Sequence, residues 1–252
     1  MFDRYVLPTV PISKRASEVT GLTSDGQALY HLGRIVNAIH IKQALCELRD
    51  FLQDNNGEGR QCLLVAHNGN LFDSNVLMHH LVENKEVDNF NKVCAGFADS
   101  LPVSRALHPQ RKEQKKTYQL SSLCRDLCNH QYDAHNAQND VIALEKLCGT
   151  FTDQQILSTA IDIKYVANRI LYNSNAQKCK QSFSRMEREK VISSCMAMKA
   201  ARSGLKYEHL QLAFTRGGAD GLRNLLTEKS GGKPRVTVQT IVLDRIISHF
   251  SL

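Results

Sequence analysis

Two short segments constrain this chain more than any other part of its sequence: residues 66–73 (AHNGNLFD) and residues 134–140 (AHNAQND). The first follows an apolar run, and the second opens a helical pattern. Together they supply two carboxylates, Asp73 and Asp140, and an imidazole, His135. These groups are most of what metal-assisted cleavage of a phosphodiester needs. The two segments therefore indicate hydrolytic chemistry and predict which residues would carry it.

A further acidic pair is missing ahead of these segments. Sites of this kind usually carry an Asp-x-Glu on an early strand, and neither Asp-x-Glu nor Asp-x-Asp occurs before Ala66. The chain therefore provides half of the usual metal ligands.

Composition excludes several classes of protein. Hydrophobic residues make up 42% and charged residues 23% of the 252 residues, as in ordinary globular proteins. We expect no membrane association, because no apolar run approaches the ~18 residues that a membrane helix needs and the first residues lack the layout of a signal peptide. The eight cysteines include no Cys-x-x-Cys pair and mostly lie in apolar stretches. This pattern predicts reduced thiols in the nucleus or cytoplasm, and no zinc site.

Positive charge is concentrated in the last hundred residues. Residues 1–150 carry 16 Lys/Arg and 17 Asp/Glu, a net charge of −1, whereas residues 151–252 carry 16 and 8, a net charge of +8. The change predicts a domain boundary near Thr150 and an anionic partner for the basic part. Nucleic acid binding and helices with merely solvated basic faces are the two alternatives.

Hydrophobic periodicity predicts strands that alternate with helices in the first 150 residues. We expect strands at residues 3–7, 62–66 and 93–98, and helices at residues 29–39, 44–52, 74–84, 118–127 and 135–148. The continuous apolar run at 62–66 is typical of a strand that is buried on both faces. The alternation indicates an α/β layer architecture, and from Asp153 onward the pattern predicts helices only.

The positions of the acidic residues suggest how they could act. Asp73 comes after the strand at 62–66, at the carboxyl end, where open α/β sheets place ligands. The alternative is that Asp73 caps the helix that follows. His135 and Asp140 are five residues apart and do not share a strict helix face, but they converge if His135 lies at the entry to the helix. A neutral imidazole there could remove a proton from water, whereas the alternative is a histidine on the surface.

The order of the pieces resembles the DEDDh class of 3′→5′ exonucleases, in the ribonuclease H-like superfamily, over roughly residues 2–150. Five collinear segments carry the resemblance: residues 2–23 (FDRYVLPTVPISKRASEVTGLT), 64–73, 98–109 (ADSLPVSRALHP), 118–127 and 135–140. They are similar, in order, to the stretch after the family's second strand, its second motif, its Asp-Thr-Leu…Pro segment, the helix before its third motif, and that motif. The resemblance implies a ribonuclease H-like mixed sheet flanked by helices, which lacks its first strands here.

The resemblance also implies roles for particular residues. Asp73 and Asp140 would bind Mg²⁺ or Mn²⁺, and His135 would activate the attacking water at the 3′ end of a single strand. Three further residues would shape the site near the terminal nucleotide: His67, Asn68 and Phe72. The family normally supplies four carboxylates. With two, we expect an incomplete two-ion site and little or no hydrolysis from this chain alone.

The missing strand leaves two interpretations open. In this fold the first strand lies at the centre of the sheet, and its neighbours lose ladder partners without it. Either the chain is a piece of a longer exonuclease-fold protein, which we favour, or it is a degenerate domain kept for binding. An exonuclease-like domain with a basic helical region at 151–252 also resembles the C-terminal region of the promyelocytic leukaemia protein family in its long form. That layout would imply a nuclear, non-catalytic module with nucleic acid or protein partners.

Overall fold

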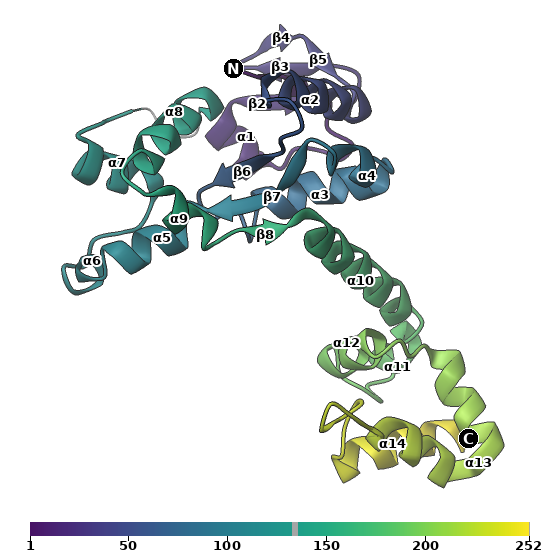
Figure 1. Cartoon of the computed structure of the whole chain (residues 1–252). Helices are drawn as coiled ribbons and strands as arrows, with labels where there is room; N and C mark the ends of the chain where they lie inside the picture. The colour runs from purple at the N-terminus through teal and green to yellow at the C-terminus, as the bar shows by residue number, and fades with distance from the viewer. Residues whose placement is uncertain (133–135, 252) are drawn as a thin grey trace. The chain divides into compact units, whose positions relative to one another are not determined.

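The computed structural model describes residues 1–132 and 136–251, and it divides the chain into two compact units, Met1–Ala167 and Asn168–Leu252 (Figure 1). The first unit is mixed α/β, and the second is mostly helical. The units meet after Ala167, whereas the change in charge predicts a boundary near Thr150. Residues 151–167 belong to the first unit because the strand β8 (Ile161–Asp162) pairs with β7 (Cys94–Asp99).

The N-terminal part of the first unit holds two small sheets. β1 pairs in parallel with β5, and β2, β3 and β4 form an antiparallel meander. The bounds of these elements and of the enclosed helix are β1 (Tyr5–Val6), α1 (Lys14–Thr20), β2 (Leu22–Ser24), β3 (Leu29–His31), β4 (Arg34–Val36) and β5 (Ala38–Ile39). The helix expected at 29–39 is therefore wrong. Leu32 and Gly33 have φ values of +49° and +77°, and they make the tight turn of a hairpin between β3 and β4.

A three-stranded sheet forms the centre of the first unit, in the order β6-β7-β8. β6 (Cys62–Ala66) is parallel to β7, and β8 is antiparallel to it. β6 lies at the edge, and its outer side has no strand partner in the part of the chain that the structure describes. All five residues of β6 are only partly buried, which corrects the expectation of a strand buried on both faces. The open edge accounts for the exposure.

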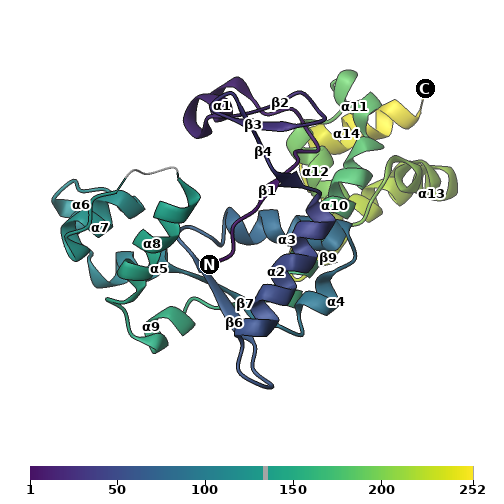
Figure 2. The same ribbon diagram turned by 90° about the horizontal axis from the view of Figure 1, so that it is seen from above.

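Helices surround this sheet. They are α2 (Ile41–Asn55), α3 (Asp73–Glu83), α4 (Val87–Phe90), α5 (Ser100–Leu107), α6 (Gln110–Glu113), α7 (Leu120–Cys128), α8 (Ala137–Cys148) and α9 (Asp153–Leu157). α7 and α8 pack on each other through buried Leu123, Cys124, Ala143 and Leu147. Both views place α7 and α8 beyond the carboxyl ends of β6 and β7 (Figure 1 and Figure 2). This end of the sheet is where the two acidic segments meet.

The second unit is built around its own apolar core. Its elements are α10 (Ile163–Gln181, which crosses the boundary), α11 (Ser184–Arg188), α12 (Ser194–Arg202), α13 (Tyr207–Thr227), β9 (Lys229–Ser230), β10 (Lys233–Pro234) and α14 (Thr240–Phe250). Phe183, Met186, Leu210, Leu222 and Leu226 are fully or almost fully buried in the core. The prediction of helices only after Asp153 is wrong at two places. These are β8 and the hairpin of β9 and β10, which turns at Gly231 and Gly232 with φ values of +57° and +78°.

Two global features complete the fold. No helix in the described ranges is long and apolar enough to cross a membrane. The eight cysteines are free thiols, of which Cys94 and Cys124 are buried and Cys195 is exposed.

Candidate functional site

One buried carboxylate holds the loop that follows β6. Asp99, at the end of β7, is 3% exposed and accepts hydrogen bonds from the backbone N–H groups of Asn68 (2.8 Å), Asn70 (3.1 Å) and Leu101 (2.9 Å). Asn68 has a φ of +64°, a left-handed conformation that asparagine tolerates better than most residues. Asp99 thereby fixes the path of the chain from β6 to the start of α3, and with it the position of Asp73.

His67 is a second anchor of the same loop. Its Nδ1 lies 2.8 Å from the Ser100 hydroxyl, and its Nε2 lies 2.7 Å from the Tyr118 carbonyl oxygen. The side chain is half-buried, and this burial lowers the pKa of His67 below its ordinary value. Because both ring nitrogens have protein partners, His67 ties β6 to α5 and to the segment before α7.

The structure brings the acidic residues of the two motifs to one cavity. A cavity of about 750 Å³ at the carboxyl end of β6 is lined by Asp73 from α3, Asp140 from α8 and His67. Two other predicted residues lie outside its lining: Asn68 is exposed, and the Phe72 side chain is 67% exposed. His135 lies outside the residues that the structure describes. Residues 73 and 140 therefore line one cavity although they are far apart in sequence.

The two carboxylates differ in their surroundings. Partial burial, and in second place the charge of Asp99, raise the pKa of Asp73. Asp140 accepts a hydrogen bond from the hydroxyl of Tyr132, whose pKa is raised first by burial and then by this carboxylate. Each aspartate lies in the first turn of its helix, where a negative charge is favourable even without a ligand.

The cavity does not fit a two-ion site. Its oxygen donors include the two carboxylates and the hydroxyl of Ser74, which is 1% exposed and has no hydrogen-bond partner among the described residues. Mg²⁺ favours such hard oxygen ligands. Within the same residues, however, no group of three or more His, Cys, Asp or Glu could hold a metal ion. The other walls are mainly apolar: Leu48, Leu64, Leu77, Leu120, Val141 and Leu144.

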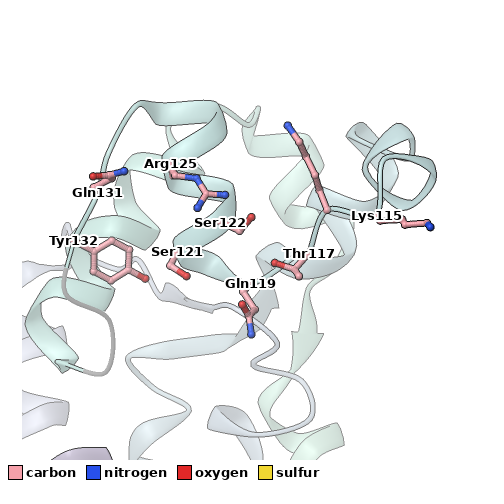
Figure 3. A pocket seen from close by; sticks show the side chains of 9 residues that line it. Lys115, Thr117, Gln119, Ser121, Ser122, Arg125, Gln131 and Tyr132 are labelled. Atoms are coloured by element: carbon pink, nitrogen blue, oxygen red, sulfur yellow. The ribbon is translucent and has the colours of Figure 1, made fainter.

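A polar cavity of about 570 Å³ is lined by Tyr132, whose hydroxyl group contacts Asp140 (Figure 3). It is lined by the start of α7 and the segment before it, including Thr117, Ser121, Ser122 and Arg125. Figure 3 shows Tyr132 and Ser121 among the side chains that line it. Asp126 lies 3.1 Å from Arg125 and neutralises part of its charge. Hydroxyl, amide and cationic groups, Lys115 and Lys116 among them, therefore line this polar hollow together with Tyr132.

Sequence reasoning missed Asp99 and Tyr132. Asp99 could have been found because it ends the apolar strand β7 and precedes a helix. The neighbouring strand, β6, ends in a loop rich in Asn and Gly. Tyr132 carries no comparable signal, because nothing in its own sequence neighbourhood marks it as a partner of Asp140 on α8.

Comparisons with known proteins give two kinds of likeness. The chain is 34% identical over 149 residues to mouse Three prime repair exonuclease 2, which covers 54% of this chain and 56% of that protein. It is 29% identical over 136 residues to DNA polymerase III PolC-type of Ureaplasma parvum, covering 53% of this chain and 8% of the polymerase. The corresponding polymerase of Streptococcus pneumoniae strain D39 is 30% identical over 111 residues, covering 44% of this chain and 6% of the polymerase.

The second likeness concerns the other end of the chain. A family model described as "PML, C-terminal domain" matches residues 179–252, which lie within the second unit. The likenesses support an exonuclease-like domain in this chain, joined to a segment similar to that C-terminal domain. The chain spans about half the length of the mouse exonuclease and less than a tenth of each polymerase.

Proposed function

We propose that this chain is a nucleic-acid-binding protein of the exonuclease type, which seats the 3′ end of a single strand in the cavity at the carboxyl end of β6. One observation carries the proposal: Asp73 and Asp140 line the same cavity although they come from different motifs and different helices. The mouse relative is named an exonuclease, and its likeness supports the same class of ligand for this chain. The apolar walls could accept a terminal base, and the polar hollow beside Tyr132 could contact a neighbouring phosphate.

We further propose that the chain alone hydrolyses this end slowly or not at all. Clamping the attacking and leaving oxygens of a phosphodiester takes two metal ions, and the cavity offers two carboxylates to neutralise them. Asp73 and Asp140 would hold a single hydrated Mg²⁺ or Mn²⁺ weakly. The ion would supply positive charge for the phosphate, and Asp99 and His67 would keep the surrounding loop in place.

Binding tests the first part of the proposal. Fluorescence anisotropy would compare a 12-nucleotide strand that ends in a free 3′ hydroxyl with one that ends in a 3′ phosphate, with and without Mg²⁺. We expect Mg²⁺ to raise the affinity for the free end about tenfold, the equivalent of about 1.4 kcal/mol. The double variant Asp73→Asn/Asp140→Asn should lose this increase.

A matched control removes two carboxylates from elsewhere in the same unit. Asp54 and Asp88 are exposed, and their carboxylates make no hydrogen bond or ion pair with other described residues. The double variant Asp54→Asn/Asp88→Asn should keep the response to Mg²⁺. Equal responses of both double variants, or equal binding of the free and blocked ends, would contradict the proposal.

Hydrolysis tests the second part. A 3′-labelled strand would be incubated with Mg²⁺ or Mn²⁺ and either this chain or the His135→Ala variant. We expect no metal-dependent shortening above background with either protein. Shortening by the unchanged chain that the variant loses would show an active exonuclease and refute the proposed weakness of the site.

The open edge of β6 favours one alternative function, an inactive interaction module. An extended polypeptide could pair with this edge and fill the apolar part of the cavity with its side chains. Hydrogen exchange separates the two functions. A strand end in the cavity should slow exchange of the β6 amides, whereas a cavity reserved for a polypeptide leaves that exchange unchanged at saturating oligonucleotide.

A further inference from the structure

A basic pocket lies in the second unit, apart from the residues of the proposed exonuclease-like site. Its volume is about 530 Å³, and four cationic side chains line it: Lys199, Arg202, Lys229 and Arg235. Glu228 is the acidic residue in the lining, and Tyr172 and Pro234 complete the apolar part. With four positive charges and one negative charge, the lining has a net charge of +3.

Two sets of contacts build the pocket from separate segments. The Tyr172 hydroxyl on α10 donates a hydrogen bond to the Arg202 carbonyl oxygen at the end of α12 (2.7 Å). Arg235 follows the hairpin of β9 and β10, and its guanidinium contacts the Glu228 carboxylate (2.8 Å) and the Ser203 carbonyl oxygen (3.2 Å). These contacts hold the walls together, and Lys199, Lys229 and the guanidinium group of Arg202 take no part in them.

Those remaining cations have no counter-charge. Lys199, Arg202 and Lys229 make no side-chain ion pair or hydrogen bond with any other residue that the structure describes. Lys199 and Arg202 are three positions apart on α12 and share one face. The negative end of that helix favours both of them. It does not account for Lys229, which the β9–β10 hairpin brings to the same hollow.

The shape and chemistry of the pocket indicate its ligand. Arg and Lys side chains that converge on one hollow bind phosphate through charge-assisted hydrogen bonds. The volume leaves room for more than one phosphate group. Tyr172 is 52% exposed while its hydroxyl is held by the protein, so the ring can offer a face to a base. Residues 168–252 carry 15 Lys/Arg and 6 Asp/Glu, a net charge of +9, which suits a polyanion better than a singly phosphorylated peptide.

We propose that this pocket binds successive phosphates of single-stranded nucleic acid and stacks an adjoining base on Tyr172. The proposal concerns the second unit and holds whether or not the cavity at β6 seats a 3′ end. The strand would contact the three cations without partners through its phosphates. Arg235 would serve as a fixed part of the wall.

Anisotropy of a labelled 12-nucleotide strand on the full chain provides the test. The pocket variant Lys199→Ala/Arg202→Ala/Lys229→Ala should lower the affinity at least tenfold in ~0.1 M salt. It should also reduce the slope of log affinity against log salt by ~2, at ~0.7 for each lost contact. The control variant Lys178→Ala/Arg188→Ala/Arg216→Ala removes the same charge from exposed residues of the same unit outside the pocket, and it should lower the affinity less than threefold.

Two substitutions of Tyr172 test the stacking. Tyr172→Phe keeps the ring and should bind within about twofold of the unchanged chain, whereas Tyr172→Leu should bind at least fivefold more weakly. Equal losses in the two triple variants would overturn the proposal. The proposal would also be overturned if the pocket variant lost its binding of a phosphoserine peptide but bound the oligonucleotide as tightly as the unchanged chain. Far-UV circular dichroism would establish that each variant is folded.

Discussion

Replacing Asp99 with alanine should test how the loop after β6 is held. The side chain is 3% exposed, and its carboxylate accepts three backbone hydrogen bonds, from Asn68, Asn70 and Leu101. Alanine would remove the acceptor and leave three N–H groups without their partner. The perturbation is local, because no packing volume larger than a carboxylate is lost.

The size of the effect follows from those bonds. A hydrogen bond to a charged group contributes about 1.5–3 kcal/mol, and bonds to one acceptor do not add fully. Asn68 is exposed, so water can replace part of what its N–H loses. We therefore expect Asp99→Ala to lower the free energy of unfolding of the first unit by about 3 kcal/mol.

Urea unfolding followed by far-UV circular dichroism would measure this loss. Asp162→Ala is the matched control, because Asp162 accepts backbone hydrogen bonds from Lys164 (2.7 Å) and Tyr165 (3.1 Å) but is exposed. A helix cap of that kind contributes about 1 kcal/mol. If Asp99→Ala costs no more than Asp162→Ala, the carboxylate does not hold the loop and the reasoning is refuted.

Two further predictions concern packing and pH. A Cβ at Gly96 would lie 2.1 Å from the Ile161 carbonyl oxygen, so Gly96→Ala should push β8 from β7 and cost about 2–3 kcal/mol in urea unfolding. Gly149→Ala, where the nearest atom is 3.4 Å away, should cost nothing; equal costs would contradict this packing argument. Burial lowers the pKa of His67 below 6.5, so the unfolded chain takes up the proton more readily. The stability due to His67 should therefore be complete above about pH 6.5 and fall as the pH drops below it. The unfolding free energies of wild type and His67→Gln should converge between pH 7 and pH 5, and parallel pH profiles would exclude this linkage.

Local patterns predicted much of the central sheet and its first helices. α2, β6 and β7 lie where apolar periodicity places them, because an amphipathic face or a compact apolar run is a property of neighbouring residues. The segment at 29–39 failed because its apolar spacing suits a helix as well as a hairpin. The turn lies at Leu32 and Gly33, and Leu32 has no preference for the positive φ that it adopts there. β8 was missed because a strand of two residues depends on the close approach that Gly96 allows.

The candidate site was less predictable than the sheet. The position of Asp73 after β6 follows from the sequence, but its place in the same cavity as Asp140 depends on how α8 packs at the end of the sheet. His67 was expected to shape the site near the terminal nucleotide; it lines the cavity, and both of its ring nitrogens have protein partners. The position of Asp99 at the end of a strand is visible in the sequence, but the convergence of three N–H groups from two segments on it is not.

The net charge of a segment does not predict a binding site, whereas the arrangement of its charged side chains in space does. The net charge of residues 151–252 fits both solvated helix faces and a binding site. Screening limits exposed charges to a range of about 10 Å at 0.1 M salt, so only cations that gather around one hollow act strongly on the same phosphate. Lys199, Arg202 and Lys229 meet that condition, and the fold brings them together from a helix and a hairpin. Two variants with equal net charge should therefore differ in binding, and that difference distinguishes a site from a basic surface.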